Sequence, residues 1–259
     1  MAKGKRFDPR KGARPKKPRK GENWLYGQHA VRAALANPAR RCLRLLATEE
    51  AAAALPASLA AAAAERKTVA RTEIEARLPA GAVHQGLALL VEPLVGPDLA
   101  GLLAAADGAR PILVLDQVAD PRNLGAALRA AAAFDAAALL VPDRRTPEAT
   151  GALAKAASGA LETVPLVRVV NLARALATLK DAGYRCIGLD GGAAATLADT
   201  DLDGPVALVL GAEERGLRRL TREACDSLAR IPISPGMESL NVATATAIAL
   251  YDRARRQPG

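Results

Sequence analysis

Six short apolar runs in the second half of the chain constrain its fold more than any other feature. They lie between residues 112 and 233 and read ILVLD, AALLV, TVPLVRV, RCIGLD, VALVLG and ARIPI. None of them alternates strictly between apolar and polar residues, which is typical of strands that are covered on both faces. Helical or loop-like segments separate the runs, and this alternation predicts an α/β fold with a parallel sheet. Parallel sheets bind ligands beyond the carboxyl ends of their strands.

The chain before this sheet divides into three parts. Residues 1–22 are predicted to form a disordered basic arm, because ten of the first 20 residues are Lys or Arg and almost none is apolar. Such an arm suits a polyanionic partner. Residues 23–93 mix helical and strand-like pieces and predict a small α/β domain. Residues 94–110 are rich in Pro, Gly and Asp and predict a linker, so that residues 111–259 form the second domain.

Composition excludes several classes of function. The chain has only six aromatic residues, too few for a platform that stacks single-stranded bases. Its three cysteines and two histidines lack disulfide or metal-ligand spacing, so we expect no metal site and a reducing compartment. No uncharged run is long enough to cross a bilayer and no secretory signal is present, which predicts a cytoplasmic protein without membrane contact.

The loop after the first apolar run reads DPRNLG, residues 120–125. Its single glycine argues against a dinucleotide-binding dehydrogenase. Asn123 has the position of a helix cap. The helix that follows is apolar except for Arg129, and a guanidinium in such surroundings needs a partner. That partner is either a buried carboxylate or an anion held in a cleft, and the sequence leaves both open.

Two further loops follow later strands. The loop GAEERG, residues 211–216, places Glu213 and Glu214 where they either cap the next helix or line a pocket for a cationic cofactor. The loop IPISPGMESLNV, residues 231–242, offers Ser239 as the cap of the last helix. Asn241 then falls in the first helical turn, where we expect its amide to be buried and hydrogen-bonded.

Taken together, these motifs resemble a known family. The chain resembles the SpoU (TrmH-type) branch of the SPOUT RNA 2'-O-methyltransferases in three motifs that occur in the same order. These are DPRNLG followed by an arginine, GAEERG, and the segment that ends in SLNV. The stretches YGQHAVRAAL, GAVHQGLAL and LTREACDSLARIPI are similar to the bacterial members that methylate a guanosine ribose of 23S ribosomal RNA. Two departures stand out. Ala243 replaces a common serine, and Glu214 and Arg215 replace a common glycine and acid.

The resemblance implies a ribosomal-protein-like N-terminal domain that binds RNA and a C-terminal SPOUT domain with a trefoil knot. It implies S-adenosyl-L-methionine as cofactor, 23S ribosomal RNA as partner and a homodimer. The implied cofactor-binding residues are Gly211, Ile231 and Leu240, and the implied catalytic residues are Asn123, Arg129, Glu213, Ser239 and Asn241.

Within this site we expect Arg129 to clamp the target phosphate and stabilise the developing alkoxide, from its own chain or from the partner subunit. Asn123 and Ser239 would orient the hydroxyl, and Glu213 would hold Arg129. The alternatives are a transfer-RNA methyltransferase of the same family and a non-catalytic RNA-binding protein of ribosome assembly.

Overall fold

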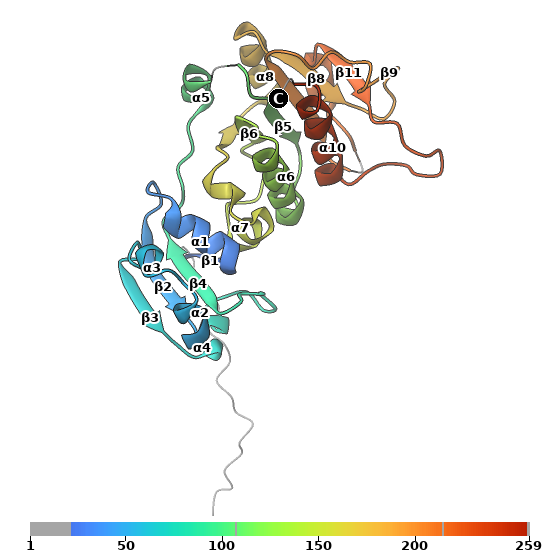
Figure 1. Ribbon diagram of the computed structural model, residues 1–259. Helices are drawn as coiled ribbons and strands as arrows, with labels where there is room; N and C mark the ends of the chain where they lie inside the picture. Colours follow the sequence, from blue (N-terminus) through green and yellow to red (C-terminus); the bar gives the residue numbers. More distant parts are fainter. Residues whose placement is uncertain (1–21, 107, 214, 258–259) are drawn as a thin grey trace, which may run out of the picture.

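The computed structural model describes residues 22–106, 108–213 and 215–257, so nearly all of the predicted basic arm lies outside the described residues. The described chain contains two sheets, one in each half of the sequence, which Figure 1 shows at opposite ends of the molecule. No helix among the described residues is long and apolar enough to cross a membrane.

The first sheet has four strands in the order β1-β4-β2-β3, of which only β2 and β3 run parallel. Its elements are β1 (Asn23–Tyr26), α1 (Gln28–Ala36), β2 (Cys42–Ala47), α2 (Glu49–Ala53), α3 (Ala57–Ala60), β3 (Glu65–Thr68), α4 (Arg71–Glu75) and β4 (Leu87–Val91). The alanine-rich run of residues 51–64 forms two short helices, α2 and α3, because Pro56 cannot continue the first helix.

The second sheet confirms the predicted parallel α/β architecture. Its strands are β5 (Ile112–Asp116), β6 (Ala138–Pro142), β7 (Leu166–Val169), β8 (Arg185–Leu189), β9 (Ala195–Thr196), β10 (Val206–Gly211) and β11 (Ser227–Arg230). They lie in the order β7-β6-β5-β10-β8-β11-β9, and every pair is parallel. Five of the six apolar runs contain a strand as predicted, whereas only the first two residues of ARIPI belong to one, because β11 ends at Arg230 and residues 231–233 lie in the following loop. The short β9 is an addition that the sequence did not indicate.

Helices cover both faces of this sheet. On one face pack α6 (Pro121–Ala133), α7 (Gly151–Ala157) and α10 (Val242–Ala254), together with the 3-10 helix η1 (Ala160–Glu162). On the other face pack α5 (Leu99–Ala105), α8 (Leu172–Asp181) and α9 (Arg219–Ala224). Helices α6 and α7 approach closely at Gly125, where an added Cβ would lie 2.5 Å from the Cβ of Ala156. This close packing fixes the helix that carries Asn123 and Arg129.

The two halves of the chain share one hydrophobic core. Leu25 and Val31 of the first half belong to the same buried cluster as Leu124 and Leu153 of the second. Figure 1 shows α1 and α7 beside each other at this junction. An added Cβ at Gly151 would lie only 2.2 Å from the carbonyl oxygen of Trp24, so the backbones of α7 and β1 are in direct contact.

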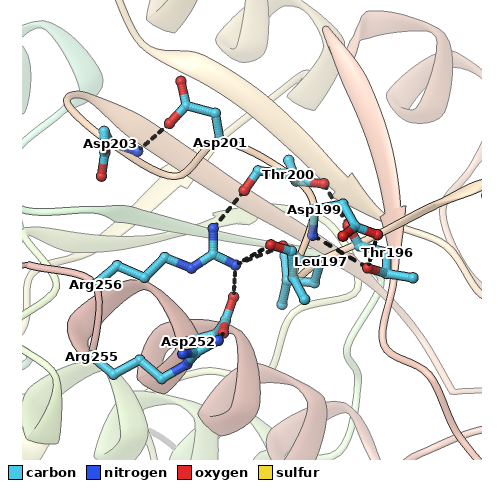
Figure 2. Close-up of polar contacts among 10 residues, drawn as sticks. Thr196, Leu197, Asp199, Thr200, Asp201, Asp203, Asp252, Arg255 and Arg256 are labelled. Atoms are coloured by element: carbon cyan, nitrogen blue, oxygen red, sulfur yellow. Dashed lines mark hydrogen bonds and ion pairs between the residues drawn. The ribbon is translucent and has the colours of Figure 1, made fainter.

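The last turn of α10 is tied to the loop that connects β9 and β10 (Figure 2). The Arg256 guanidinium donates to the carbonyl oxygens of Thr200 at 2.7 Å, Leu197 at 2.9 Å and Ala198 at 3.0 Å, and it pairs with Asp252. Three main-chain acceptors and one carboxylate use most of the donors of this side chain. The position of α10 is therefore fixed at the end opposite to Asn241.

Candidate active site

Three loops meet at the carboxyl edge of the second sheet and bring together an amide–carboxylate cluster of Asn123, Glu213 and Asn241. Oε1 of Glu213 accepts hydrogen bonds from Nδ2 of Asn123 at 2.7 Å and from Nδ2 of Asn241 at 2.6 Å. The backbone N–H of Val242 donates to the same oxygen at 3.3 Å, and the two amides are joined at 3.1 Å. Residues separated by up to 118 positions in the sequence thus form a single hydrogen-bonded group.

The orientation of Asn241 follows from its place at the start of α10. It is the N-cap of this helix, and its Oδ1 accepts from the backbone N–H of Ala243 at 2.9 Å and of Thr244 at 3.3 Å. With the oxygen used in this way, the NH₂ group turns toward Glu213. The sequence assigned the cap to Ser239 and expected the Asn241 amide to be buried. Both expectations were wrong, since Asn241 is exposed and is itself the cap.

The cap assigned to Asn123 is also corrected. Asp120 caps α6 by accepting from the backbone N–H of Arg122 at 2.8 Å, which leaves the Asn123 amide free for Glu213. Glu213 does not cap α9 either. That helix follows Arg218 without a side-chain cap, and Glu213 bonds the start of α10 instead. Glu214 lies outside the described residues.

A cavity of about 420 Å³ opens on one side of Glu213. Its wall is formed by the loops after β8, β10 and β11, and it contains the three expected cofactor-binding residues, Gly211, Ile231 and Leu240, together with Ser239. The other lining residues are Leu189, Asp190, Gly191, Leu210, Ala212, Glu213, Arg215, Gly216, Leu217, Arg222, Ile233, Glu238, Val242 and Ala245. Apolar side chains, loop backbone and a few carboxylates are a typical lining for a small-molecule site.

The geometry explains why residue 211 is glycine. An added Cβ there would lie 2.0 Å from the carbonyl carbon of Gly216 and 2.3 Å from the backbone nitrogen of Leu217. The turn therefore closes backbone against backbone, and Ala212 and Gly216 form a β-bridge across it. Gly211 is required first by the turn, and its position on the cavity wall is a consequence of that turn.

A second cavity, of about 430 Å³, lies on the other side of Glu213. Both cavities are lined by Ala212, Glu213, Arg215 and Val242, so they share one wall. Asn123 lines only the second cavity, whose other lining residues are Gln117, Val118, Ala119, Asp120 and Arg145. Of the carboxylates in the described part of the chain, Glu213 alone lines both cavities.

Arg129 lies outside the site that its own chain forms. It is exposed on α6, lines neither cavity, and has no ion pair or hydrogen bond among the described residues. The expectations that Glu213 holds Arg129 and that this charge sits in apolar surroundings were wrong. The partners of Glu213 are the two asparagines and Val242, and Ala132 and Ala133 on the same helix are exposed as well.

Two acidic residues at strand ends were missed by the sequence reasoning. Asp116 ends β5, is completely buried, and accepts from Nε of Arg218 at 2.7 Å and from its backbone N–H at 3.1 Å, which ties the GAEERG loop to the sheet. Asp190 follows β8, lines the first cavity and pairs with Arg222 at 2.9 Å. A charged residue at the end of an otherwise apolar run was the available signal. The described residues contain no group of three or more His, Cys, Asp or Glu that could hold a metal ion.

Comparison with protein-family models matches residues 110–251 to the SpoU rRNA Methylase family. Residues 24–95 match a model described as RNA 2'-O ribose methyltransferase substrate binding. The two matches account for both sheets.

Similar proteins cover most of the chain. A 23S rRNA (guanosine-2'-O-)-methyltransferase RlmB from a Burkholderia species is 43% identical over 90% of this chain and 96% of its own length. The RlmB of Pseudomonas syringae pv. tomato is 39% identical over 90% and 95%.

Solved structures share the fold. The SpoU methyltransferase AviRb of Streptomyces viridochromogenes, in complex with AdoMet, has a TM-score of 0.77 at 21% identity and covers 91% of this chain and 90% of its own. A putative TrmH-family RNA methyltransferase of Porphyromonas gingivalis has a TM-score of 0.74 at 25% identity, with 92% of both chains covered.

Proposed function

The chain belongs to the SpoU rRNA methylase family, and from this premise we propose that it methylates the ribose 2'-hydroxyl of a guanosine in 23S ribosomal RNA, using S-adenosyl-L-methionine. The observation that carries the proposal is the pair of adjoining cavities that share Glu213. A methyl donor and an acceptor held on the two sides of one wall meet at the Asn123–Glu213–Asn241 cluster. Holding two reactants together in this way is itself a large part of catalysis.

The first cavity fits the cofactor. Leu189, Leu210, Ile231 and Leu240 provide apolar contacts for an adenine ring, and the loops around Gly211 provide backbone groups. The carboxylates on the wall, Asp190, Glu213 and Glu238, suit the positive charges of a sulfonium and an amino group. When bound, S-adenosyl-L-methionine supplies a methyl group that the sulfonium charge has already activated.

The second cavity is the site assigned to the ribose. A 2'-hydroxyl becomes a useful nucleophile only as its proton leaves, so a proton acceptor must lie near it. We assign this role to Glu213. Its Oε1 receives three hydrogen bonds, whereas its Oε2 has no partner in the described part of the chain. Asn123 holds the Glu213 carboxylate in place and lines the second cavity, which is assigned to the ribose. Ser239 lines the first cavity, which is assigned to the cofactor.

A homodimer explains Arg129. The exposed face of α10 carries Ile248 and Tyr251, which are 37% and 57% exposed, and the Tyr251 ring packs edge-on against Phe134 at the end of α6. Exposed apolar side chains on α10 and a guanidinium on α6 without a partner in the described chain suit a two-fold interface, through which Arg129 would reach the partner subunit's site and stabilise the developing alkoxide. We expect this homodimer to act on ribosomal RNA in the cytoplasm.

We also expect the chain to form the trefoil knot that the resemblance implies. The hydrogen bonds of Arg256 to the carbonyl oxygens of residues 197, 198 and 200 hold the loop after β9 against the end of α10 (Figure 2).

Methylation of a transcribed 23S ribosomal RNA fragment with methyl-labelled cofactor tests the proposal, followed by mapping of the modified ribose. Transfer RNA is the matched alternative substrate. Labelling of transfer RNA alone would replace the substrate, and labelling of neither RNA by a protein that binds the cofactor would overturn the activity.

Subunit mixing tests the role of Arg129. Subunits that carry Arg129→Ala are mixed with subunits that carry Ala245→Phe, a substitution on α10 that fills the first cavity. Random exchange of two inactive subunits gives about half heterodimers with one working site of two, so about a quarter of the activity should return. Zero activity after confirmed exchange would place Arg129 in its own chain's site.

A further inference from the structure

Two arginines on the wall of the second cavity have no partner within the described residues. Arg145 follows β6 and Arg215 lies in the GAEERG turn, and both are exposed without an ion pair or hydrogen bond to residues 22–106, 108–213 or 215–257. Four arginines near this edge of the sheet are instead paired with a carboxylate: Arg122 with Asp120, Arg218 with Asp116, Arg219 with Glu223 and Arg222 with Asp190. Arg144 is also exposed without a partner in the described part of the chain, but it does not line the cavity.

The backbone around Arg145 is held in an uncommon conformation. Its φ is +68°, and Gln117, on the same cavity wall, has a φ of +62°. The left-handed region costs a residue with a Cβ about 1–2 kcal/mol, and such strain collects at functional sites.

Two anchors hold the Arg145 loop. The Thr146 hydroxyl donates to the carbonyl oxygen of Pro142, and the Arg168 guanidinium donates to the carbonyl oxygens of Thr146 and Pro147. The loop is therefore braced on the C-terminal side of Arg145.

We propose that Arg145 and Arg215 bind the RNA phosphodiester groups that flank the target ribose. The proposal rests on the proposed function, because a ribose placed beside Asn123 carries a phosphate on each side along its strand. A guanidinium offers planar, paired donors that match phosphate oxygens. Asp120 on the same wall is already paired with Arg122. Apart from Glu213, which the amides of Asn123 and Asn241 hold, the unpaired charges on this wall are cationic.

The proposal also accounts for a departure from the family pattern. The family pattern that the sequence resembles has an acid at this position, and an acid would repel phosphate at this wall. Arg215 gives this chain a cation on the cavity wall, two residues from Glu213. Selection of the target site would then depend on backbone contacts made beside the reacting ribose, in addition to contacts made by the N-terminal domain.

The variants are Arg145→Asn, Arg145→Gly and Arg215→Gln, with Arg144→Asn as the matched control. Arg144 is an exposed neighbour with the same charge, but it does not line the cavity. Asn and Gly tolerate a positive φ, so loss of function in both separates the missing charge from backbone strain. Arg145→Lys keeps the charge without the paired donors.

Equilibrium binding of the 23S ribosomal RNA fragment without cofactor is the first measurement. Each cavity variant should weaken binding about tenfold and reduce the slope of log K against log salt by about 0.7–0.9. Arg144→Asn should have a smaller effect on affinity, within about twofold. In methylation assays the KM for RNA should rise in the cavity variants, while cofactor affinity stays unchanged in the Arg145 variants, because Arg145 lines only the second cavity.

The outcomes separate the two proposals. If Arg145→Asn, Arg145→Gly and Arg215→Gln bind RNA as Arg144→Asn does, the phosphate site is not in this cavity. Restoration of binding by Arg145→Gly but not by Arg145→Asn would assign the residue to loop conformation and overturn the proposal. Wild-type protein that binds the fragment with the expected salt slope but does not methylate it would overturn the proposed function and leave the phosphate contacts standing.

Discussion

Arg40 and Glu162 form a buried ion pair that joins the two halves of the chain. Nη2 of Arg40 lies 2.6 Å from Oε1 of Glu162 and Nε lies 3.1 Å from Oε2, with side chains that are 1% and 4% exposed. Asn37 donates to the same carboxylate at 2.9 Å, and Arg40 also donates to the carbonyl oxygen of Glu92 at 3.1 Å. The pair is fully hydrogen-bonded, which a buried pair requires to offset its desolvation.

Breaking this pair should destabilise the whole chain. Arg40→Met leaves the Glu162 carboxylate buried without its cation, and we expect the free energy of unfolding to fall by about 3–5 kcal/mol. Arg40→Met combined with Glu162→Leu should cost less than Arg40→Met alone, because no unpaired charge remains. Urea titrations of the single and double variants measure both effects. Equal losses in the single and double variants would show that packing, not charge, dominates at this position.

Asn241 should separate helix capping from chemistry. Asn241→Ser keeps a side-chain cap for α10 but removes the amide that donates to Glu213. We expect stability near that of the wild type and a loss of methyl transfer of at least about tenfold. Asn241→Ala should lose the cap as well, which costs about 0.5–2 kcal/mol. Thermal unfolding and initial rates check the two effects, and full activity in Asn241→Ser would remove the amide from the reaction.

Gly211 and Gly216 should respond differently to alanine. At Gly211 the new Cβ would overlap the backbone of Gly216, so the turn must open and cofactor binding should be lost. At Gly216 an added Cβ has nothing within 4 Å, but φ is +59°, so the cost should be about 1–2 kcal/mol with cofactor binding retained. Calorimetric titration with the cofactor compares the variants. Normal binding by Gly211→Ala would show that the closed turn is not needed for the site.

The thiols should be unreactive in the folded chain. Burial raises the pKa of Cys186 to about 12 and that of Cys225 to about 11, from an ordinary value of 9.0. At pH 8 the thiolate fractions are then about 10⁻⁴ and 10⁻³, and iodoacetamide should label these residues only after unfolding. Because the folded-state pKa values are raised, the associated stability is present below about pH 9 and decreases as the pH rises toward 11–12. Fast labelling at pH 8 without unfolding would contradict this.

The strands of the second sheet were predictable because burial on both faces leaves a continuous apolar run. Strand β3, with the sequence ERKT, carries no such signal, since it lies at an exposed edge and has no apolar residue. The order of the strands was not predictable from local patterns, because it depends on contacts between distant segments.

Parts of the site were predictable in the same limited way. The motifs named Asn123, Glu213 and Asn241, but the capping roles depended on where each helix begins in three dimensions. Asp120 begins α6 and Asn241 begins α10, each a few residues from the position that the sequence favoured. The sequence did not show that Arg129 is exposed, because a helix rich in alanine is apolar on every face even when one of its faces is exposed.

The hydrophobic core that the two halves of the chain share cannot form until the second half has been synthesised. Part of the apolar face of α1 is covered by α7, which begins at Gly151, more than a hundred residues after α1 ends at Ala36. At 5–20 residues per second this delay is roughly 6–23 seconds. Throughout it the emerging N-terminal half has an uncovered hydrophobic surface and Arg40 has no carboxylate to meet. The same contacts that make the finished protein one unit therefore leave the nascent chain dependent on shielding by the ribosome surface or a chaperone until α7 and Glu162 emerge.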